Sequence, residues 1–324
     1  MKGIVENVSN MEIRTIFMGT PDFAVPILES LLDNACHVVA VYTQPDKPVG
    51  RRQHLASPPV KRLAREHEIP VIQPNILKSV EAMEELASFK PELIIVAAFG
   101  YILPPEVLSL PKFGCLNVHP SLLPQHRGAS PIADAILSGD QITGVTIMLM
   151  DAGMDSGPIL AQQKMGISFT DTTGSLTSKL AQVGAELLIK TLPQWLEGKL
   201  KPRPQDEAQA TYSKLVTKED SKIDWHLSAL ELWRRIRAFN PWPGCYTWWE
   251  GKRLKIHEAA PLGEVAKGEV GKVIALLKPA PVEVGVATGE GILGLCQVQL
   301  EGKRQMSVAE FVRGQRDFIG SILG

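Results

Sequence analysis

Asn117 and His119 alternate with apolar residues in the segment CLNVHPS, residues 115–121. Because successive side chains of a β-strand point to opposite faces, a strand here puts the amide and the imidazole on one face. Pro120 cannot donate a ladder hydrogen bond, so the strand should end there. At the carboxyl end of a parallel strand, such a pair would polarise a carbonyl group and transfer a proton. An isolated N-x-H pattern more often satisfies backbone groups at a strand end, so other residues must support this hypothesis.

A glycine-rich loop, DAGMDSGP at residues 151–158, follows a second expected strand and carries the carboxylates of Asp151 and Asp155. If the strands are parallel, the loop lies at the same sheet edge, and either carboxylate could face His119. An adjacent carboxylate fixes the tautomer of an imidazole and favours its protonated form, so we expect His119 to be more fully charged in neutral solution. Turns favour Asp near Gly, and this purely structural role suits Asp151 better than Asp155.

Short β-rich runs alternate with helical patterns between residues 13 and 192, which is typical of an α/β domain with a parallel sheet covered by helices. The run at 93–98 is apolar throughout, as expected for a strand buried on both faces. Residues 172–192 form the clearest helical pattern, because their leucines and valine align on one face. The strands that we expect are 13–18, 38–42, 93–98, 115–118 and 145–150.

A stretch with two prolines, many charges and no periodic apolar face, GKLKPRPQDEAQA, begins at residue 198 and has the composition of an exposed connection. Beyond it, a helical pattern at 228–238 precedes short β-patterned runs separated by glycines, which predict a small β-barrel. These runs are 246–249, 254–257, 270–276, 282–286 and 292–299. The predicted organisation is a flexible extension (1–11), a catalytic domain (12–197), a linker (198–209) and a second domain (210–324).

The composition excludes several classes of protein. The 324 residues are 44% hydrophobic with a net charge of −1, which argues against general attraction to nucleic acid but allows local basic patches. The longest apolar run, 93–103, is about half of the roughly 20 residues that cross a bilayer, and no signal peptide is recognisable, so we expect no membrane span and an intracellular location. The G-T-P-D turn lacks G-x-G-x-x-G, which argues against a dinucleotide site. The four cysteines lie far apart, without C-x-x-C, and indicate no zinc site.

Basic residues gather in two places. The Pro-rich stretch 44–59 carries Lys47, Arg51 and Arg52, and is either a solvated loop or a contact for a phosphate-rich partner. A second group could add phosphate contacts or be ordinary surface charge. It comprises Arg234, Arg235, Arg237, Lys252, Arg253 and Lys255. Trp242, between two prolines, is expected to be a core anchor.

Five motifs, in order, resemble the methionyl-tRNA formyltransferase family, and the resemblance runs from about residue 12 to the end. It implies a formyltransferase-type Rossmann-like parallel sheet domain followed by a small OB-like β-barrel domain. It also implies 10-formyltetrahydrofolate as the formyl donor and initiator methionyl-tRNA as the acceptor, in the cytoplasm, without a metal or an obligatory protein partner. The motifs are FMGTPDF (17–23), TQPDKPVGR (43–51), NVHPSLLPQHRGASPI (117–132), GVTIMLMDAGMDSGPIL (144–160) and RAFNPWPG (237–244).

The same resemblance assigns individual residues. Asn117, His119 and Asp155 match the family's catalytic trio, since Asp155 rather than Asp151 stands in the M-D-S-G segment. Arg51 matches an arginine of a loop that contacts the tRNA acceptor arm, and we include Lys47 and Arg52 in that loop's tRNA contacts. The folate-binding segment S-L-L-P corresponds to Ser121, Leu122, Leu123 and Pro124.

Three other functions compete with this one. A formyltransferase acting on a small amine such as a nucleotide sugar, or a hydrolase releasing formate from the same folate, would share the first domain's chemistry. The basic loop and the second domain with its N-P-W-P segment favour tRNA over both. An RNA-binding protein without catalysis would not need Asn117, His119 and Asp155 together.

Overall fold

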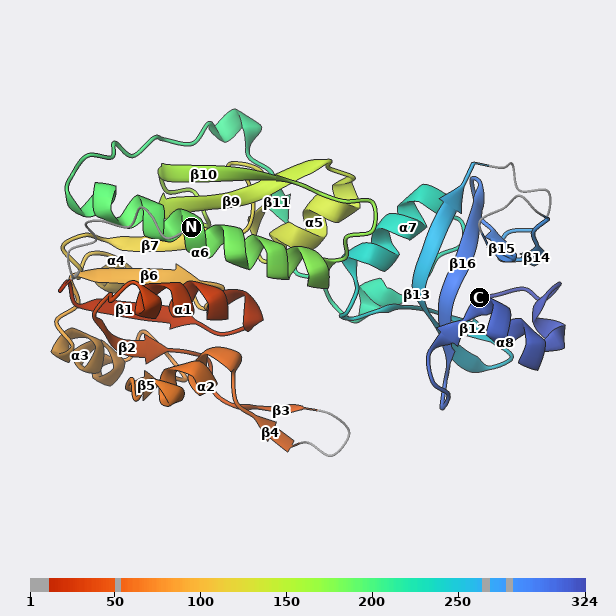
Figure 1. The fold of residues 1–324 in the computed structure, drawn as a ribbon, viewed down its shortest axis with the longest axis horizontal. Helices are drawn as coiled ribbons and strands as arrows, with labels where there is room; N and C mark the ends of the chain where they lie inside the picture. Colours follow the sequence, from red (N-terminus) through yellow and green to blue (C-terminus); the bar gives the residue numbers. More distant parts are fainter. Residues whose placement is uncertain (1–11, 50–53, 264–268, 278–281) are drawn as a thin grey trace, which may run out of the picture. The chain divides into compact units, whose positions relative to one another are not determined.

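The computed structural model describes residues 12–49, 54–263, 269–277 and 282–324, so the expected extension at 1–11 lies outside the described residues. These residues form two compact units (Figure 1). The first unit comprises the chain up to Pro131 together with Ile142–Gly166 and Thr177–Ser213. The second comprises Ile132–Gln141, Ile167–Leu176 and Lys214–Gly324.

A seven-stranded sheet in the order β10-β9-β7-β6-β1-β2-β5 forms the centre of the first unit. The five strands from β7 to β5 pair in parallel, which confirms the predicted α/β class. By contrast, β9 pairs antiparallel with β7, and β10 pairs antiparallel with β9, so the expectation that the strand before the carboxylate loop is parallel was wrong. The strands are β1 (Thr15–Gly19), β2 (Val38–Tyr42), β5 (Val71–Ile72), β6 (Leu93–Ala97), β7 (Cys115–His119), β9 (Ile142–Leu149) and β10 (Ile159–Gly166).

Helices cover both faces of this sheet. Helix α6 lies against the face that includes Val118, because a Cβ added at Gly184 would meet the side chains of Val118 in β7 and Val145 in β9 (Figure 1). The opposite face, which includes Cys115, packs against Leu86 of α3 and Val107 of α4. The helices of this unit are α1 (Val25–Asp33), α2 (Pro59–Glu66), α3 (Val80–Ser88), α4 (Pro105–Leu108) and α6 (Thr173–Leu196), the last split between the two units.

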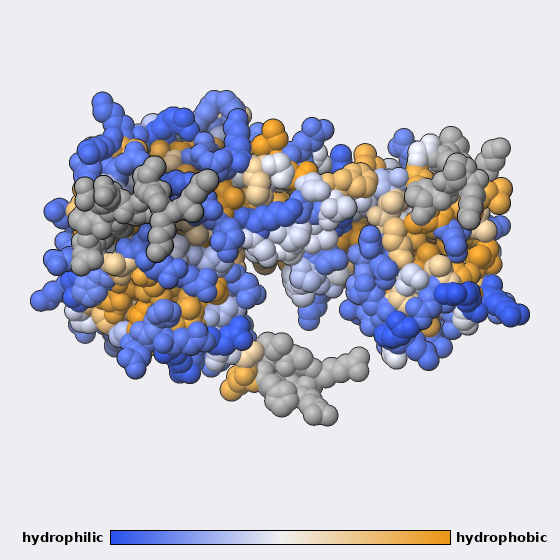
Figure 2. All heavy atoms as spheres, viewed as in Figure 1, coloured by the Kyte–Doolittle hydropathy of each residue, from blue (hydrophilic) through white to orange (hydrophobic). Residues whose placement is uncertain are grey.

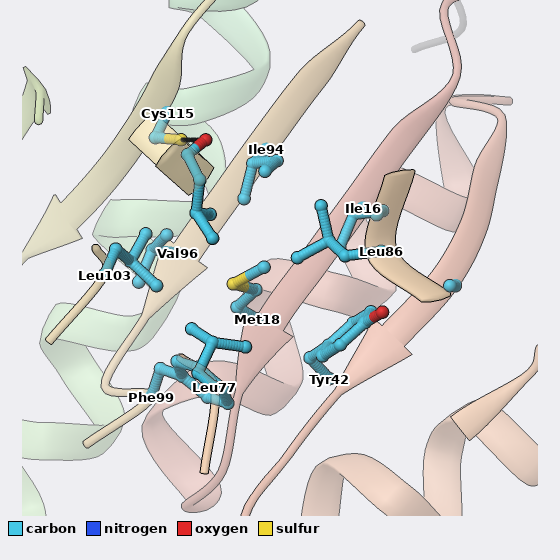
Figure 3. Packing of buried hydrophobic residues seen from close by; sticks show 12 residues of the cluster. Ile16, Met18, Tyr42, Leu77, Leu86, Ile94, Val96, Phe99, Leu103 and Cys115 are labelled. Carbon is cyan, nitrogen blue, oxygen red and sulfur yellow. Dashed lines mark hydrogen bonds between the residues drawn. The ribbon is translucent and has the colours of Figure 1, made fainter. Parts of the chain in front are cut away.

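The core on the α3 side brings together apolar side chains from four neighbouring strands (Figure 3). Fully burying a side chain such as Ile94 or Met18 contributes about 1.5–3 kcal/mol, so this cluster is a major part of what holds the unit together. Truncating Leu86, which is wholly buried, to Ala should cost about 2–5 kcal/mol. Since Cys115 shares its face of β7 with Asn117 and His119, the same core supports the candidate site.

The second unit contains an antiparallel sheet in the order β12-β13-β16-β15-β14, with β17 paired to β16, and it matches the predicted OB-like class. Helix α7 begins at a capping box, in which Ser228 and Glu231 each bond the other's backbone N–H. Trp249 and Phe318 meet edge to face in the core. The elements are α5 (Pro131–Ser138), α7 (Ala229–Ala238), β12 (Cys245–Trp249), β13 (Lys252–Leu262), β14 (Val273–Ala275), β15 (Val284–Ala287), β16 (Ile292–Leu300), β17 (Met306–Ser307) and α8 (Val308–Gly314).

The segment expected to be a linker is hydrogen-bonded to the first unit. Ile159 and Arg203 exchange backbone N–H···O bonds of 2.8 and 2.9 Å. Further along, β11 (Tyr212–Ser213) pairs in parallel with β8 (Arg127–Gly128). The first unit therefore includes the chain as far as Ser213.

The face of the molecule drawn in Figure 2 is mainly hydrophilic, with apolar side chains interspersed. Trp242 is 55% exposed, so the expectation that it anchors the core was wrong. In the described part of the chain, no helix has the length and apolarity needed to cross a membrane.

Candidate active site

The structure brings Asn117, His119 and Asp155 together in the first unit. Asn117 and His119 lie on one face of β7, as the strand period predicts, and are only 9% and 3% exposed. The Asn117 Nδ2 donates a long hydrogen bond of 3.3 Å to Oδ1 of Asp155. The same oxygen lies 3.7 Å from Nδ1 of His119, which is too far for a direct hydrogen bond. The gap between these two atoms is therefore a place where a proton can be shared through a third group.

Asp155 reaches the other two residues by an unexpected route. Since β9 is antiparallel to β7, its carboxyl end lies beside Leu116, near the amino end of β7, and the following loop must fold back. The backbone of Asp155 has φ of +51°, a left-handed conformation that is unfavourable for residues other than Gly. Its Oδ2 accepts a 2.8 Å bond from the Gly128 N–H. Gly157 closes the turn, where any Cβ would lie 1.9 Å from the Leu149 carbonyl oxygen.

The environment of His119 favours the neutral ring. Its Nε2 lies 3.1 Å from the carbonyl oxygen of His126, so Nε2 carries the proton and Nδ1 has the lone pair. Burial lowers the pKa of His119 below its ordinary value of 6.5, and the opposing effect of Asp155 is smaller. The expectation that the carboxylate makes His119 more fully charged in neutral solution was therefore wrong, because desolvation of the imidazolium outweighs the attraction.

The candidate folate residues Ser121–Pro124 directly follow the histidine. The Ser121 side chain is fully buried and donates to the Gln125 carbonyl at 2.6 Å, while Leu123 packs in a small apolar cluster. Leu122 and Pro124 are partly exposed and are the side chains of this segment that can meet a ligand. The assignment of these four residues to folate binding stays a prediction.

A cavity of about 150 Å³ borders Asp155. It includes Tyr101, Ile102 and Leu103, which the sequence analysis had not singled out. The sequence carried part of the signal, since these apolar residues follow the apolar run of β6 and precede two prolines. The structure adds that Ile102 is 76% exposed. An exposed apolar side chain beside the carboxylate of the candidate site is well placed to contact an aromatic ligand.

The basic loop is a hairpin of β3 (Lys47–Val49) and β4 (His54–Ala56). Arg51 and Arg52 lie outside the described residues, whereas Lys47 is exposed and its Nζ donates to Oε1 of Gln44 at 2.6 Å. At the base of the hairpin, the buried Lys61 pairs with Asp46 at 2.7 Å. Gln73 accepts from Lys61 at 2.6 Å and donates to Asp46 at 2.9 Å, so the three side chains fix where the hairpin leaves the unit.

Two of the helix arginines are engaged within the second unit. Arg237 donates to the carbonyl oxygens of Asp171 and Ser168 at 2.7 and 2.8 Å and lies over the Trp233 ring. Arg235 donates to the Asp220 carbonyl at 2.9 Å. These two residues have structural partners, so they are weaker candidates for phosphate contacts than the sequence suggested.

Among the described residues, no group of three or more His, Cys, Asp or Glu side chains is arranged to hold a metal ion. Residues 11–192 match the family model described as formyl transferase, and residues 215–316 match the model described as formyl transferase, C-terminal domain. A methionyl-tRNA formyltransferase of Chloroflexus aurantiacus is 45% identical over 302 residues, covering 93% of this chain and 97% of that protein. The enzyme of the same name from Bacillus pumilus is 45% identical over 96% of this chain and 98% of its own length.

Solved structures show the same fold at lower identity. HypX from Aquifex aeolicus in complex with tetrahydrofolic acid is 20% identical, with a TM-score of 0.60 over 95% of this chain and 48% of that one. A sugar 3N-formyl transferase is 18% identical, with a TM-score of 0.63 over 91% of this chain and all of its own. At 18–20% identity, these similarities show a shared fold and no more.

Proposed function

Because the chain belongs to the methionyl-tRNA formyltransferase family, we propose that it transfers the formyl group of 10-formyltetrahydrofolate to the α-amino group of methionine on initiator tRNA. One structural observation supports this proposal independently of the family. Asn117, an amide donor, lies together with His119 and Asp155, which can accept a proton as a pair. We place the reaction in the cytoplasm, where its product would start translation.

The reaction begins with the α-amine of the aminoacyl ester. An ordinary α-amine has a pKa of roughly 7.7–8.0, and the ester lowers this further, so a large fraction is neutral near pH 7. The nitrogen lone pair forms a bond to the formyl carbon, and the carbonyl electron pair moves onto the oxygen. Asn117 has one N–H directed to Asp155 and a second that can donate to this oxyanion.

The proton of the attacking nitrogen must then leave. The neutral His119 offers the lone pair of Nδ1, and Asp155 stabilises the imidazolium that forms, because its Oδ1 lies 3.7 Å from that nitrogen. When the oxyanion reforms the carbonyl, the bond from carbon to the folate nitrogen breaks, and this nitrogen accepts the proton held by the His119 imidazolium, which returns the ring to its neutral form. A lowered His119 pKa suits this sequence, because the ring must enter the cycle without a proton.

The second unit and the basic hairpin favour tRNA over a small amine as acceptor. The methionyl-tRNA formyltransferases are 45% identical to this chain, whereas the sugar formyltransferase, which covers a similar share of it, is 18% identical. Lys47, Arg51 and Arg52 of the basic stretch 44–59 would contact tRNA phosphates, and Ser121–Pro124 with the cavity beside Asp155 would hold the folate. The charge of the basic stretch supports tRNA binding, and the position of Ser121–Pro124 directly after His119 supports folate binding.

A comparison of acceptors tests the function directly. The protein is supplied with 10-formyltetrahydrofolate and one of four acceptors: charged initiator tRNA, charged elongator tRNA, an amino-sugar nucleotide or water. Formylated initiator methionyl-tRNA should form fastest. Preferential formylation of the amino sugar, or release of formate without transfer, would refute the proposal.

A further inference from the structure

We propose that Gln205 and the buried Arg127 position the catalytic carboxylate of Asp155 from behind its loop. This inference rests on the proposed formyl transfer and deepens it by adding two positioning residues to the trio. Neither residue touches the point between Asn117, His119 and Asp155 where the substrates would react. Their role is to fix the backbone that carries Asp155.

Gln205 ties the two sides of the Asp155 turn together. Its Nε2 donates to the carbonyl oxygen of Asp155 at 2.8 Å and to that of Gly157 at 2.7 Å. These two bonds use both N–H groups of the amide. The carbonyl groups that it holds flank the turn in which Asp155 adopts its left-handed φ of +51°. A residue other than Gly persists in that conformation when its surroundings determine it, and Gln205 supplies part of that determination.

Arg127 holds Gln205 in this orientation. Its Nε and Nη2 both donate to Oε1 of Gln205, at 3.1 and 2.9 Å, which forces the amide nitrogen toward the Asp155 turn. The remaining donors bind Glu207 at 2.7 and 2.9 Å and the Tyr212 hydroxyl at 3.0 Å. All five N–H groups of the guanidinium are therefore used, although the residue has no exposed surface.

The residues on either side of Arg127 contact the trio themselves. The His126 carbonyl accepts from His119 Nε2, and the Gly128 N–H donates to Asp155 Oδ2. The Arg127 backbone is fixed too, since its N–H donates to the Thr211 carbonyl at 2.9 Å and its carbonyl accepts from the Ser213 hydroxyl at 3.0 Å. One buried arginine thus connects the chain at 205–213 to both the imidazole and the carboxylate of the site.

The arrangement is specific in a way that simple stabilisation does not require. An apolar side chain could fill the volume of a buried arginine, and a buried ion pair adds little net stability over such a replacement. Here two guanidinium donors orient the Gln205 amide, and both donors of that amide bind the Asp155 turn. This arrangement fixes the position of the turn. A displacement of about 1 Å in a catalytic group can cost as much as 100-fold in rate.

The test uses the full chain with Gln205→Met, which keeps the side-chain length but removes both donors. We expect kcat for initiator methionyl-tRNA formylation to fall by roughly 10–100-fold while KM for either substrate changes little. The His119 ring titration, followed by NMR without substrates, should move to lower pH, because a displaced Asp155 no longer raises the pKa of His119. Gln209→Ala is the matched control, since the side chain of that exposed glutamine in the same segment donates to the exposed Asp206 and not to the Asp155 turn.

Gln205→Glu provides a second variant that still offers oxygen acceptors to Arg127 but has lost both donors. It should reproduce the fall in kcat if Gln205→Met is poorly folded, whereas its added negative charge opposes the downward shift of the His119 titration. Unchanged kcat and an unchanged His119 titration in a folded variant would overturn the proposal, as would a rise in KM alone. The titration does not depend on tRNA or folate, so it can be read even if the wild-type protein fails to formylate methionyl-tRNA and the proposed function itself is wrong.

Discussion

Replacing Asn117 with Ala should separate the chemistry of the site from its stability. Asn117 is the group that would donate to the oxyanion, and its carboxamide has one N–H bonded to Asp155 at 3.3 Å and one left for the substrate. Removing an oxyanion donor typically lowers kcat by about 10²–10³-fold, which corresponds to about 2.7–4 kcal/mol of transition-state stabilisation.

The structural cost of the same change should be smaller. The hydrogen bond that is lost is long, and a typical intramolecular bond contributes about 0.5–1.5 kcal/mol to stability. The Asp155 side chain is 18% exposed, so its Oδ1 can regain water when Asn117 is truncated. We therefore expect the free energy of unfolding to fall by about 1 kcal/mol, which is less than the expected rise in the activation free energy of the reaction.

Single-turnover formylation at saturating folate and methionyl-tRNA measures the chemical step, and denaturant unfolding measures stability. Asn117→Asp serves as the matched variant, because it preserves size while replacing the donor with an acceptor, and its rate should fall at least as far. Near-normal turnover of Asn117→Ala would remove this residue from the mechanism. A rate loss that disappears after correction for the folded fraction would assign Asn117 a purely structural role.

Four further predictions concern the other groups. His119→Ala and Asp155→Asn should each be severe, and the double variant should be little worse than either, because the two residues act as a unit; additive losses would show independent roles. Burial puts the folded pKa of His119 below 6.5, so the unfolded chain binds more protons between the two values and stability should rise with pH in that interval. Unfolding free energies of His119→Gln should lack that slope, and an unchanged slope would assign it to another group. Arg51→Ala should weaken use of charged tRNA, leave folate binding nearly unchanged, and make the salt dependence of tRNA affinity shallower. Lys61→Met should likewise raise KM for tRNA more than KM for folate, because Lys61 anchors the base of the hairpin; equal changes in both constants would contradict this role.

The sequence predicted the parts of this molecule that depend on local periodicity. The period of two in CLNVHPS placed Asn117 and His119 on one face of a strand, and the structure has them there. The apolar run at 93–98 became the buried central strand β6, and the amphipathic pattern from 172 became α6. In each case the signal lies within one element, where burial of an apolar face decides the structure.

The direction in which β9 pairs with β7 was harder to predict, because it depends on the connection between the two strands and not on the residues of either strand. Nothing in residues 142–149 distinguishes a parallel from an antiparallel partner, and β10, whose burial is partial, has a weak pattern. The prediction that His119 is charged was wrong for a related reason. The carboxylate partner was visible in the sequence, but the burial that outweighs it is a property of the folded neighbourhood.

The position of Asp155 shows why a motif can mark a candidate catalytic residue without explaining its geometry. M-D-S-G marks the carboxylate, but the turn that carries it has a left-handed φ that residues other than Gly seldom adopt, and it folds back from an antiparallel strand. Its geometry is set by Gly128, 27 residues away, and by Gln205, 50 residues away from Asp155. Gln205 lies in a stretch whose prolines and charges resemble a solvated linker, and nothing local in that stretch indicates a role in the site. Gln205 donates to backbone carbonyl oxygens of the turn, and every residue type has such an oxygen. The residue types in the turn therefore do not reveal the interaction. Contacts between distant parts of the chain determine the geometry of the candidate site.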